Sequence, residues 1–245
     1  MLVQEAIDEA LAPFFEKHLI TEVRQTIKSG KEASVYLCEA DPSTGVRHLA
    51  AKIYRPREGR AFKNDAVYQA GEWIGDRRTR KALAQKSNHG RRFQFGNWVE
   101  REFQTLHHLH AFGAIVPKPY ARSESALLMQ FIGDEEGAAL PLNRVTLDRE
   151  EADAFFGLLL RNIELWLTLD HIHADLSPFN VLYHAGAITV IDFPQAVNAD
   201  KNPNSYMLLQ RDIENVCRYF ARYGIDANAS AIAGELWGRY MRDEF

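Results

Sequence analysis

The spacing of apolar residues predicts a chain that begins with a helix and continues into β-strands. Residues 4–19 carry apolar side chains at helical spacing. Residues 26–38, with a small polar turn at 29–34, and residues 48–54 have the pattern of a three-stranded meander. Residues 125–133 form a further apolar stretch that ends in glycine. The first half of the chain is therefore expected to fold around a small β-sheet.

The second half of the chain is predicted to be mostly helical, apart from one β-hairpin. Apolar residues recur at helical spacing in three segments, 148–169, 206–223 and 229–241. Between the first two segments, two short apolar or β-branched runs flank Ala185 and Gly186, as in a hairpin. The combination of these elements predicts an α+β fold.

We divide the predicted fold into three parts, with the main boundary at the glycine that ends the last strand of the sheet. A helical lead-in occupies residues 1–24, a β-rich domain occupies 25–133, and a mostly helical domain occupies 134–245. The β-rich domain also contains a helix at 97–110, and a basic insertion at about 55–95 precedes that helix.

Charge is spread unevenly along the chain. The 245 residues carry a net charge of −4, whereas eleven basic and four acidic residues lie between Arg55 and Arg92. The net charge of +7 in this segment suits a contact with a polyanion such as ribosomal RNA, and it suits a solvated insertion equally well. The sequence leaves both interpretations open.

Cysteine content and the start of the chain point to the cytoplasm. Cys38 and Cys217 lie far apart in apolar surroundings, which predicts buried thiols rather than a disulfide or a zinc site. The first residues lack the pattern of a signal peptide, and no apolar run approaches the roughly 20 residues of a membrane helix. We therefore expect a soluble, cytoplasmic protein without membrane contact.

The strongest chemical signal runs from Asp170 to Val197. Asp175 and Asn180 share one short polar loop, and the predicted hairpin returns the chain so that Asp192 lies beside Asn180. Carboxylate and amide oxygens are ligands that Mg²⁺ prefers, with phosphate oxygens often completing its shell. The spacing predicts Asn180 and Asp192 as metal ligands and Asp175 as the group that positions a nucleophile for phosphoryl transfer. A turn merely rich in Asp and Asn is the alternative, and the whole string is too specific to favour it.

A second group of polar residues belongs to the predicted sheet. Lys52 interrupts an apolar strand and needs an anionic partner there, because burying an unpaired ammonium is costly. Glu102, on the predicted helix at 97–110, is the first candidate partner, and Glu100 is the second. Alternatively, Lys52 is a solvent-facing residue on an edge strand.

The order of these parts resembles the protein-kinase-like fold and, within it, the RIO family of atypical serine kinases. Four strings carry the resemblance: S-G-K-E-A-S-V-Y from Ser29, A-A-K-I-Y from Ala50, H-A-D-L-S-P-F-N-V-L-Y from His173 and I-D-F-P-Q-A-V from Ile191. We expect no winged-helix domain of the kind that one branch carries at its N-terminus, since residues 1–24 are too few for it. The chain is therefore similar to the RIO1-like branch, in a compact, bacterial-type form with a single kinase domain.

The resemblance implies a bilobal fold, with a β-rich N-lobe and a reduced, mostly helical C-lobe, that uses ATP with Mg²⁺ or Mn²⁺. It implies that Lys52, held by Glu102, contacts the ATP phosphates and that Asp175 and Asp192 are catalytic. Asn180 and Asp192 would bind the metal. The nucleotide would also be lined by residues of the polar loop and of the last strand, namely Ser29, Gly30, Lys31, Ser34, Val35, Met129, Gln130 and Ile132.

The resemblance further implies phosphorylation of protein serines, including autophosphorylation, on a substrate that the sequence does not define. Three alternatives remain open. The first is an ATPase in ribosome- or RNA-related work, in which Asp192 takes the phosphoryl group transiently. The second is a small-molecule kinase of the aminoglycoside or choline type, and the third is a binding module that contacts ribosomal RNA through residues 55–92.

Asp212 would either brace the loop of Asp175 or lie at the surface.

Two substitutions distinguish the chain from ordinary protein kinases. Ala174 stands where they often carry an arginine, so an activation loop switched by phosphate–arginine pairing is not expected. Pro194 stands where a glycine would normally follow Phe193. Its fixed φ and missing N–H are expected to limit flipping of Asp192.

Overall fold

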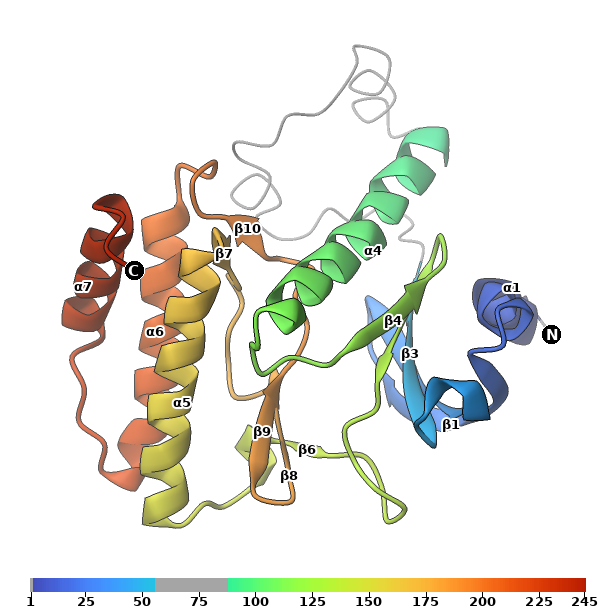
Figure 1. Cartoon of the computed structure of the whole chain (residues 1–245), viewed down its shortest axis with the longest axis horizontal. Coiled ribbons are helices and arrows are strands. Elements are labelled where there is room, and N and C mark those ends of the chain that lie inside the picture. The colour runs from blue at the N-terminus through green and yellow to red at the C-terminus, as the bar shows by residue number, and fades with distance from the viewer. Residues whose placement is uncertain (1, 56–87) are drawn as a thin grey trace. The chain divides into compact units, whose positions relative to one another are not determined.

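The structure is a computed structural model that describes residues 2–55 and 88–245 (Figure 1). The described residues form two compact units. The first unit holds residues 2–55, 88–107 and 117–138, and the second holds residues 108–116 and 139–245. The predicted basic insertion lies mostly outside the described residues.

A five-stranded antiparallel sheet forms the body of the first unit. Its strands lie in the order β1-β2-β3-β5-β4. Their bounds are β1 Ile20–Ser29, β2 Ala33–Ala40, β3 His48–Tyr54, β4 Pro119–Arg122 and β5 Ala126–Gln130. The central strand β3 is buried along most of its length, in keeping with its continuous apolar run, whereas the edge strand β1 is mostly exposed.

The edge strand β4 was not predicted by the apolar pattern. It is only four residues long and begins with Pro119, so its sequence is typical of a connection. A proline is compatible with the first residue of an edge strand, where its missing N–H costs no ladder hydrogen bond. The predicted meander, by contrast, is confirmed as β1, β2 and β3.

Helix α1, Leu2–Glu16, packs against this sheet (Figure 1). Its Leu11 and Phe14 are fully buried and belong to one hydrophobic cluster with strand residues such as Leu49 and Leu128. Burial of such side chains stabilises the folded state by about 1.5–3 kcal/mol each. The helix is therefore part of the core of the first unit. The predicted helical lead-in of residues 1–24 is wrong at its end, because α1 stops at Glu16 and β1 already begins at Ile20.

Helix α4, Asn88–Ala111, begins earlier than the predicted start, so Asn97 lies inside the helix and is not its N-cap. The apolar spacing predicts an inward face of Val99, Phe103, Leu106 and His110 with Glu102 at its edge, and the buried stripe differs from it. Val99, Glu102 and Leu106 are buried, whereas Phe103 is only half-buried. The inward face of the helix is thus centred on Glu102 rather than bordered by it.

Three helices make up most of the second unit and lie side by side in Figure 1. They are α5 Arg149–Thr168, α6 Ser205–Phe220 and α7 Ala229–Met241. The predicted start of α5 is confirmed, because Asp148 and Glu151 form a capping box in which each side chain bonds the backbone N–H of the other residue.

Two small sheets carry the polar loops of the second unit. Strands β8, Val181–His184, and β9, Ala187–Val190, form the predicted hairpin, and β6, Leu140–Pro141, pairs with β8. The hairpin turn places Ala185 and Gly186 at φ of 48° and 76°, as a two-residue turn of type I′ requires. Strands β7, His171–Ile172, and β10, Val197–Asn198, form the other sheet.

In the part of the chain that the structure describes, no helix has the length and apolar character needed to cross a membrane. Cys38 and Cys217 are free, buried thiols, as predicted. Burial raises the pKa of Cys38 to about 12, so this thiol stays protonated and unreactive at neutral pH.

Alanine substitutions at Gly133 and Gly137 test the backbone conformation of the loop that follows β5. It bridges Ala138 across a tight loop at φ of 147°, and a Cβ atom there would collide with the carbonyl oxygen of Gly137. Gly137 has a similar φ of 155° but open space around its Cα. We expect Gly133→Ala to lower the free energy of unfolding by about 2–4 kcal/mol, and Gly137→Ala by only about 1 kcal/mol. Urea denaturation compares them, and equal losses would show that no collision occurs.

Candidate functional site

The predicted phosphate loop is the tight turn between β1 and β2. Ser29 and Ser34 face each other across the strand ladder, and the Gly30 N–H donates to the Ala33 carbonyl at 2.9 Å. Lys31 is exposed at the tip of the turn. Val35 pairs with Lys52 of β3, so the loop and the strand lysine lie on neighbouring strands in register.

Arg55 is a residue of this loop that sequence analysis missed. Its guanidinium donates to the hydroxyls of both Ser29 and Ser34 at 2.7 Å, and its backbone N–H donates to the Glu32 carbonyl at 2.8 Å. Arg55 was assigned only to the basic insertion. Only the register of the strands, which the sequence does not give, brings the residue after β3 beside the turn between β1 and β2.

Lys52 and Glu102 form a buried ion pair inside the first unit. The Lys52 ammonium lies 2.7 and 2.8 Å from the two carboxylate oxygens of Glu102. Only 7% of Lys52 and 1% of Glu102 is exposed. Glu100 instead forms an ion pair with Arg122. The edge-strand alternative for Lys52 is therefore wrong, because β3 is central in the sheet.

The residues of the last strand that are predicted to line the nucleotide, on the side of its adenine base, lie at the end of β5 and after it. Met129 pairs with Ala50 of β3, and the backbone N–H of Gln130 donates to the Lys118 carbonyl at 2.8 Å. That N–H is therefore engaged in the sheet, and a base contact would fall to other backbone groups of this segment, such as those of Ile132.

In the second unit, three side chains of α6 fix the backbone of the loop that carries Asp175. Asp212 accepts the N–H groups of Ala174 and Leu176, at 2.7 and 2.9 Å. Arg211 donates to the Ala174 carbonyl, and Asn215 donates to the Leu176 carbonyl. Asp212 therefore braces the loop, and the alternative of a surface acid is wrong, since this side chain is buried.

A short chain of hydrogen bonds brings Asp175, Asn180 and Asp192 into one neighbourhood. The side-chain amide of Asn180 donates to the backbone carbonyl of Asp175 at 3.0 Å. The backbone carbonyl of Asn180 accepts the N–H of Ile191 at 2.9 Å. Asp192 follows Ile191 directly. Asn180 is buried, Asp192 is half-buried and Asp175 is exposed. The hairpin thus returns the chain as predicted.

His173 makes a second link between the two loops. Its Nδ1 accepts the N–H of Asp175 at 3.3 Å, so Nε2 carries the proton and donates to the Ile191 carbonyl at 3.1 Å. The ring packs against Phe193 at a tilt of 49°, with the ring centroids 4.4 Å apart, and Phe193 also contacts Trp166 edge-on. Buried aromatic packing therefore holds the residue next to Asp192 in place.

The side chains of Asn180 and Asp192 offer oxygen atoms of the type that a small hard cation prefers. Mg²⁺ typically takes one or two carboxylate or amide oxygens from protein and completes its shell with phosphate oxygens and water. Among the described residues, no three His, Cys, Asp or Glu side chains form a metal-binding group. A divalent ion at this site would thus share its shell with a ligand such as a nucleotide.

Comparison with known proteins assigns the family. A profile of the RIO domain matches residues 34–232. The chain belongs to the RIO domain family. It is 35% identical over 205 residues to a serine/threonine-protein kinase rio1 of Schizosaccharomyces pombe, covering 83% of this chain and 39% of the relative. A Rio1 kinase of Haloferax volcanii is 29% identical over 206 residues, covering 84% of this chain and 66% of the relative.

The fold of this RIO domain is the protein-kinase-like one. The Rio2 kinase of Chaetomium thermophilum, solved as an ADP/Mg²⁺-phosphoaspartate complex, superposes with a TM-score of 0.66 at 21% identity. The match covers 96% of this chain and 72% of that structure. The predicted α+β class, with a β-rich N-lobe and a mostly helical C-lobe, is confirmed. The chain spans less than half the length of the fission yeast relative.

Breaking the Lys52–Glu102 pair should be costly. Glu102→Gln would leave the buried Lys52 ammonium without its carboxylate, and we expect the free energy of unfolding to fall by about 3–5 kcal/mol. Glu100→Gln removes a partly exposed ion pair and should cost less than about 1 kcal/mol. Chemical denaturation of the two variants makes the comparison, and similar losses would contradict a desolvated pair.

Asp212 should give folding a pH dependence of known sign. Burial raises its pKa to about 7, against the lowering effect of the two N–H donors and of Arg211. Between about pH 4 and pH 7 the folded state therefore binds a proton that the unfolded state has released. Stability from this group is present at low pH and falls as the pH rises through 7, by up to about 1.4 kcal/mol per pH unit.

The test compares the unfolding free energy of the wild-type protein with that of Asp212→Asn from pH 5 to pH 8. The substitution removes the titration while keeping the size of the side chain. We expect the wild type to lose stability relative to the variant as the pH rises. A constant difference across this range would show that the Asp212 pKa is not raised.

Proposed function

We propose that this RIO domain protein is an atypical serine/threonine protein kinase that transfers the γ-phosphate of ATP to a serine hydroxyl, with autophosphorylation included. The observation that carries the proposal is the hydrogen-bonded chain from Asp175 through Asn180 to Ile191, the residue before Asp192. Along this chain one side-chain amide, Asn180, lies near two acids, Asp192 and the exposed Asp175. The names of the relatives, which are serine/threonine-protein kinases, support it.

Each residue has a proposed role. Asn180 and Asp192 hold Mg²⁺ or Mn²⁺, which supplies positive charge to neutralise the phosphates when it is bound. Asp175 orients the acceptor hydroxyl and accepts its proton as the bond to phosphorus forms. In the other unit, Lys52 contacts the α- and β-phosphates, and Glu102 keeps its ammonium in position.

The polar turn and the end of β5 complete the proposed nucleotide site. Ser29, Gly30, Lys31, Ser34 and Val35 lie beside the triphosphate. Arg55 fixes the two serine hydroxyls and so shapes the turn. Met129, Gln130 and Ile132 line the adenine.

Partners and location are also proposals. A protein with a reactive serine is the proposed substrate class. Contact with ribosomal RNA through residues 55–92 rests on the net charge of that segment, which lies mostly outside the described residues. A cytoplasmic location rests on the sequence pattern alone.

The decisive assay incubates the protein with γ-labelled ATP and Mg²⁺ or Mn²⁺, with and without casein as an acceptor. We expect Asp175→Asn and Asp192→Asn to lower label transfer at least 100-fold, because general-base and charge-stabilising groups typically contribute that much. Asp226→Asn, which changes an exposed acid elsewhere in the second unit, should leave transfer unchanged.

The chemistry of the labelled product separates kinase from ATPase. Label on serine is stable to acid, whereas an aspartyl-phosphate is cleaved by hydroxylamine. Hydroxylamine-sensitive label that disappears in Asp192→Asn, without any phosphoserine, would replace the kinase proposal with the ATPase. Faster transfer to kanamycin or choline than to protein would replace it with a small-molecule kinase.

A further inference from the structure

At strand β3, the sheet of the first unit has two different faces. Ala51 and Ile53 belong to the hydrophobic cluster that also contains residues of α1. Lys52, between them, contacts Glu102 of α4, and its ammonium lies 4.9 Å from the ring centroid of Tyr54. Successive side chains of a strand point to opposite faces. One face of the sheet is therefore packed against α1, and the other carries the buried ion pair.

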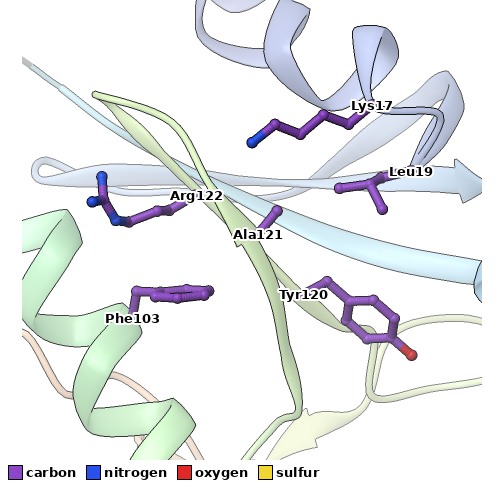
Figure 2. Close-up of a pocket in the computed structure, with 6 residues that line it drawn as sticks. All are labelled: Lys17, Leu19, Phe103, Tyr120, Ala121 and Arg122. Atoms are coloured by element: carbon purple, nitrogen blue, oxygen red, sulfur yellow. The ribbon is translucent and has the colours of Figure 1, made fainter.

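Figure 2 shows the two sides of the sheet around a hollow at the edge strand β4. Lys17, which directly follows α1, lies on one side of the strands in this view, and Phe103 of α4 lies on the other. The face of any strand residue can be found from its partner, because residues directly opposite each other in an antiparallel ladder point to the same face.

Strand register places the two serines of the phosphate turn on the α1 face. Ser34 is paired with Ile53, and Ser29 is paired with Ser34. Val35, by contrast, is paired with Lys52 and shares the face of the ion pair. The two serine hydroxyls thus lie on the face opposite the Lys52 ammonium, which the proposed function places at the ATP phosphates.

Arg55 holds the turn from this same α1 face. Its guanidinium donates to the hydroxyls of Ser29 and Ser34 at 2.7 Å each, and its backbone N–H donates to the Glu32 carbonyl at 2.8 Å. Ser34 is only 3% exposed, and its hydroxyl also lies 3.4 Å from the hydroxyl of Ser29. One residue thus binds the two ends of the turn and its tip.

We propose that Arg55 is a positioning residue for ATP, which fixes the turn from the α1 face while the phosphates meet the backbone N–H groups of the turn and the exposed Lys31. The turn lies beside the triphosphate by the proposed function, on which this role of Arg55 rests. Successive backbone N–H groups of a turn form concave anion sites, and a turn that is already fixed loses less entropy when its ligand binds. The serine hydroxyls are then anchors for Arg55 and not ligands of phosphate.

Titration calorimetry of the full chain with adenosine and with AMP-PNP, a non-hydrolysable analogue of ATP, in the presence of Mg²⁺ measures this role. We expect Arg55→Met to weaken AMP-PNP binding about three- to tenfold, because the turn loses its fixed shape. Adenosine has no phosphates, so its affinity should change less than about twofold. Arg55→Lys keeps a donor for the hydroxyls and should bind AMP-PNP more tightly than Arg55→Met does. Arg24→Met, which removes an equal charge from β1, should leave both affinities unchanged.

A mutant cycle separates positioning from direct contact with phosphate. The Ser29→Ala, Ser34→Ala double variant removes both anchors and should weaken AMP-PNP binding about as much as Arg55→Met. Adding Arg55→Met to it should cause less than about a twofold further loss, because groups that act through one contact are not additive. If Arg55 touched a phosphate itself, the triple variant would lose affinity well beyond the double variant.

Circular dichroism and thermal unfolding verify that each variant is folded, and Ser29→Ala alone replaces the double variant if the buried Ser34 does not tolerate substitution. Unchanged AMP-PNP binding in folded Arg55→Met would overturn the role of Arg55 and leave the proposed function standing. An equal loss for adenosine, or a multiplied loss in the triple variant, would overturn it as well. Failure of the wild type to bind AMP-PNP would remove the proposed function together with it.

Discussion

The carboxylate of Asp212 is the contact on which the polar loops of the second unit depend. It accepts two backbone N–H groups, from Ala174 and Leu176, and so fixes the residues on both sides of Asp175. From there, hydrogen bonds continue through Asn180 to Ile191, the residue before Asp192. A buried acid on a core helix thus sets the backbone of both loops. Asp212 thus helps to position Asp175 and Asp192 through the backbone of their loops.

In the first unit the buried charge is positive, and it too needs a partner of fixed geometry. An ammonium is buried in a central strand only where a carboxylate meets it with both oxygens, as Glu102 does for Lys52. Such a pair adds little net stability compared with apolar residues, because desolvation offsets the attraction. Its value lies in geometry, since removing either partner leaves a buried charge. In each unit a buried charged side chain is therefore held in one position, because any other position would leave a buried polar group without its hydrogen-bonding partner.

The sequence was informative where a residue pattern strongly favours one physical solution. A lysine inside an apolar strand favoured a buried acid over an edge-strand position, and the Ala185-Gly186 turn between two short strands favoured a hairpin. Glu102 could be preferred over Glu100 by helical spacing, although the true inward stripe of α4 is shifted. The bond from Arg55 to two serine hydroxyls could not be predicted, because it depends on strand register and not on local pattern. For the same reason β4 was missed, since only its neighbour β5 makes it a strand.

The backbone at Ala174 and Asp192 shows what tertiary contacts add beyond any pattern. Both residues have left-handed φ, 63° and 74°, which costs a non-glycine residue about 1 kcal/mol or more. At Ala174 the N–H is held by Asp212 and the carbonyl by Arg211, so the surrounding helix imposes the conformation. At Asp192 the neighbouring Phe193 is locked between His173 and Trp166. Aromatic packing therefore fixes the residue that follows Asp192, and the expected effect of Pro194 on Asp192 stays a prediction. Two of the left-handed non-glycine residues thus lie at or next to Asp175 and Asp192, and contacts in the core of the second unit compensate for their strain.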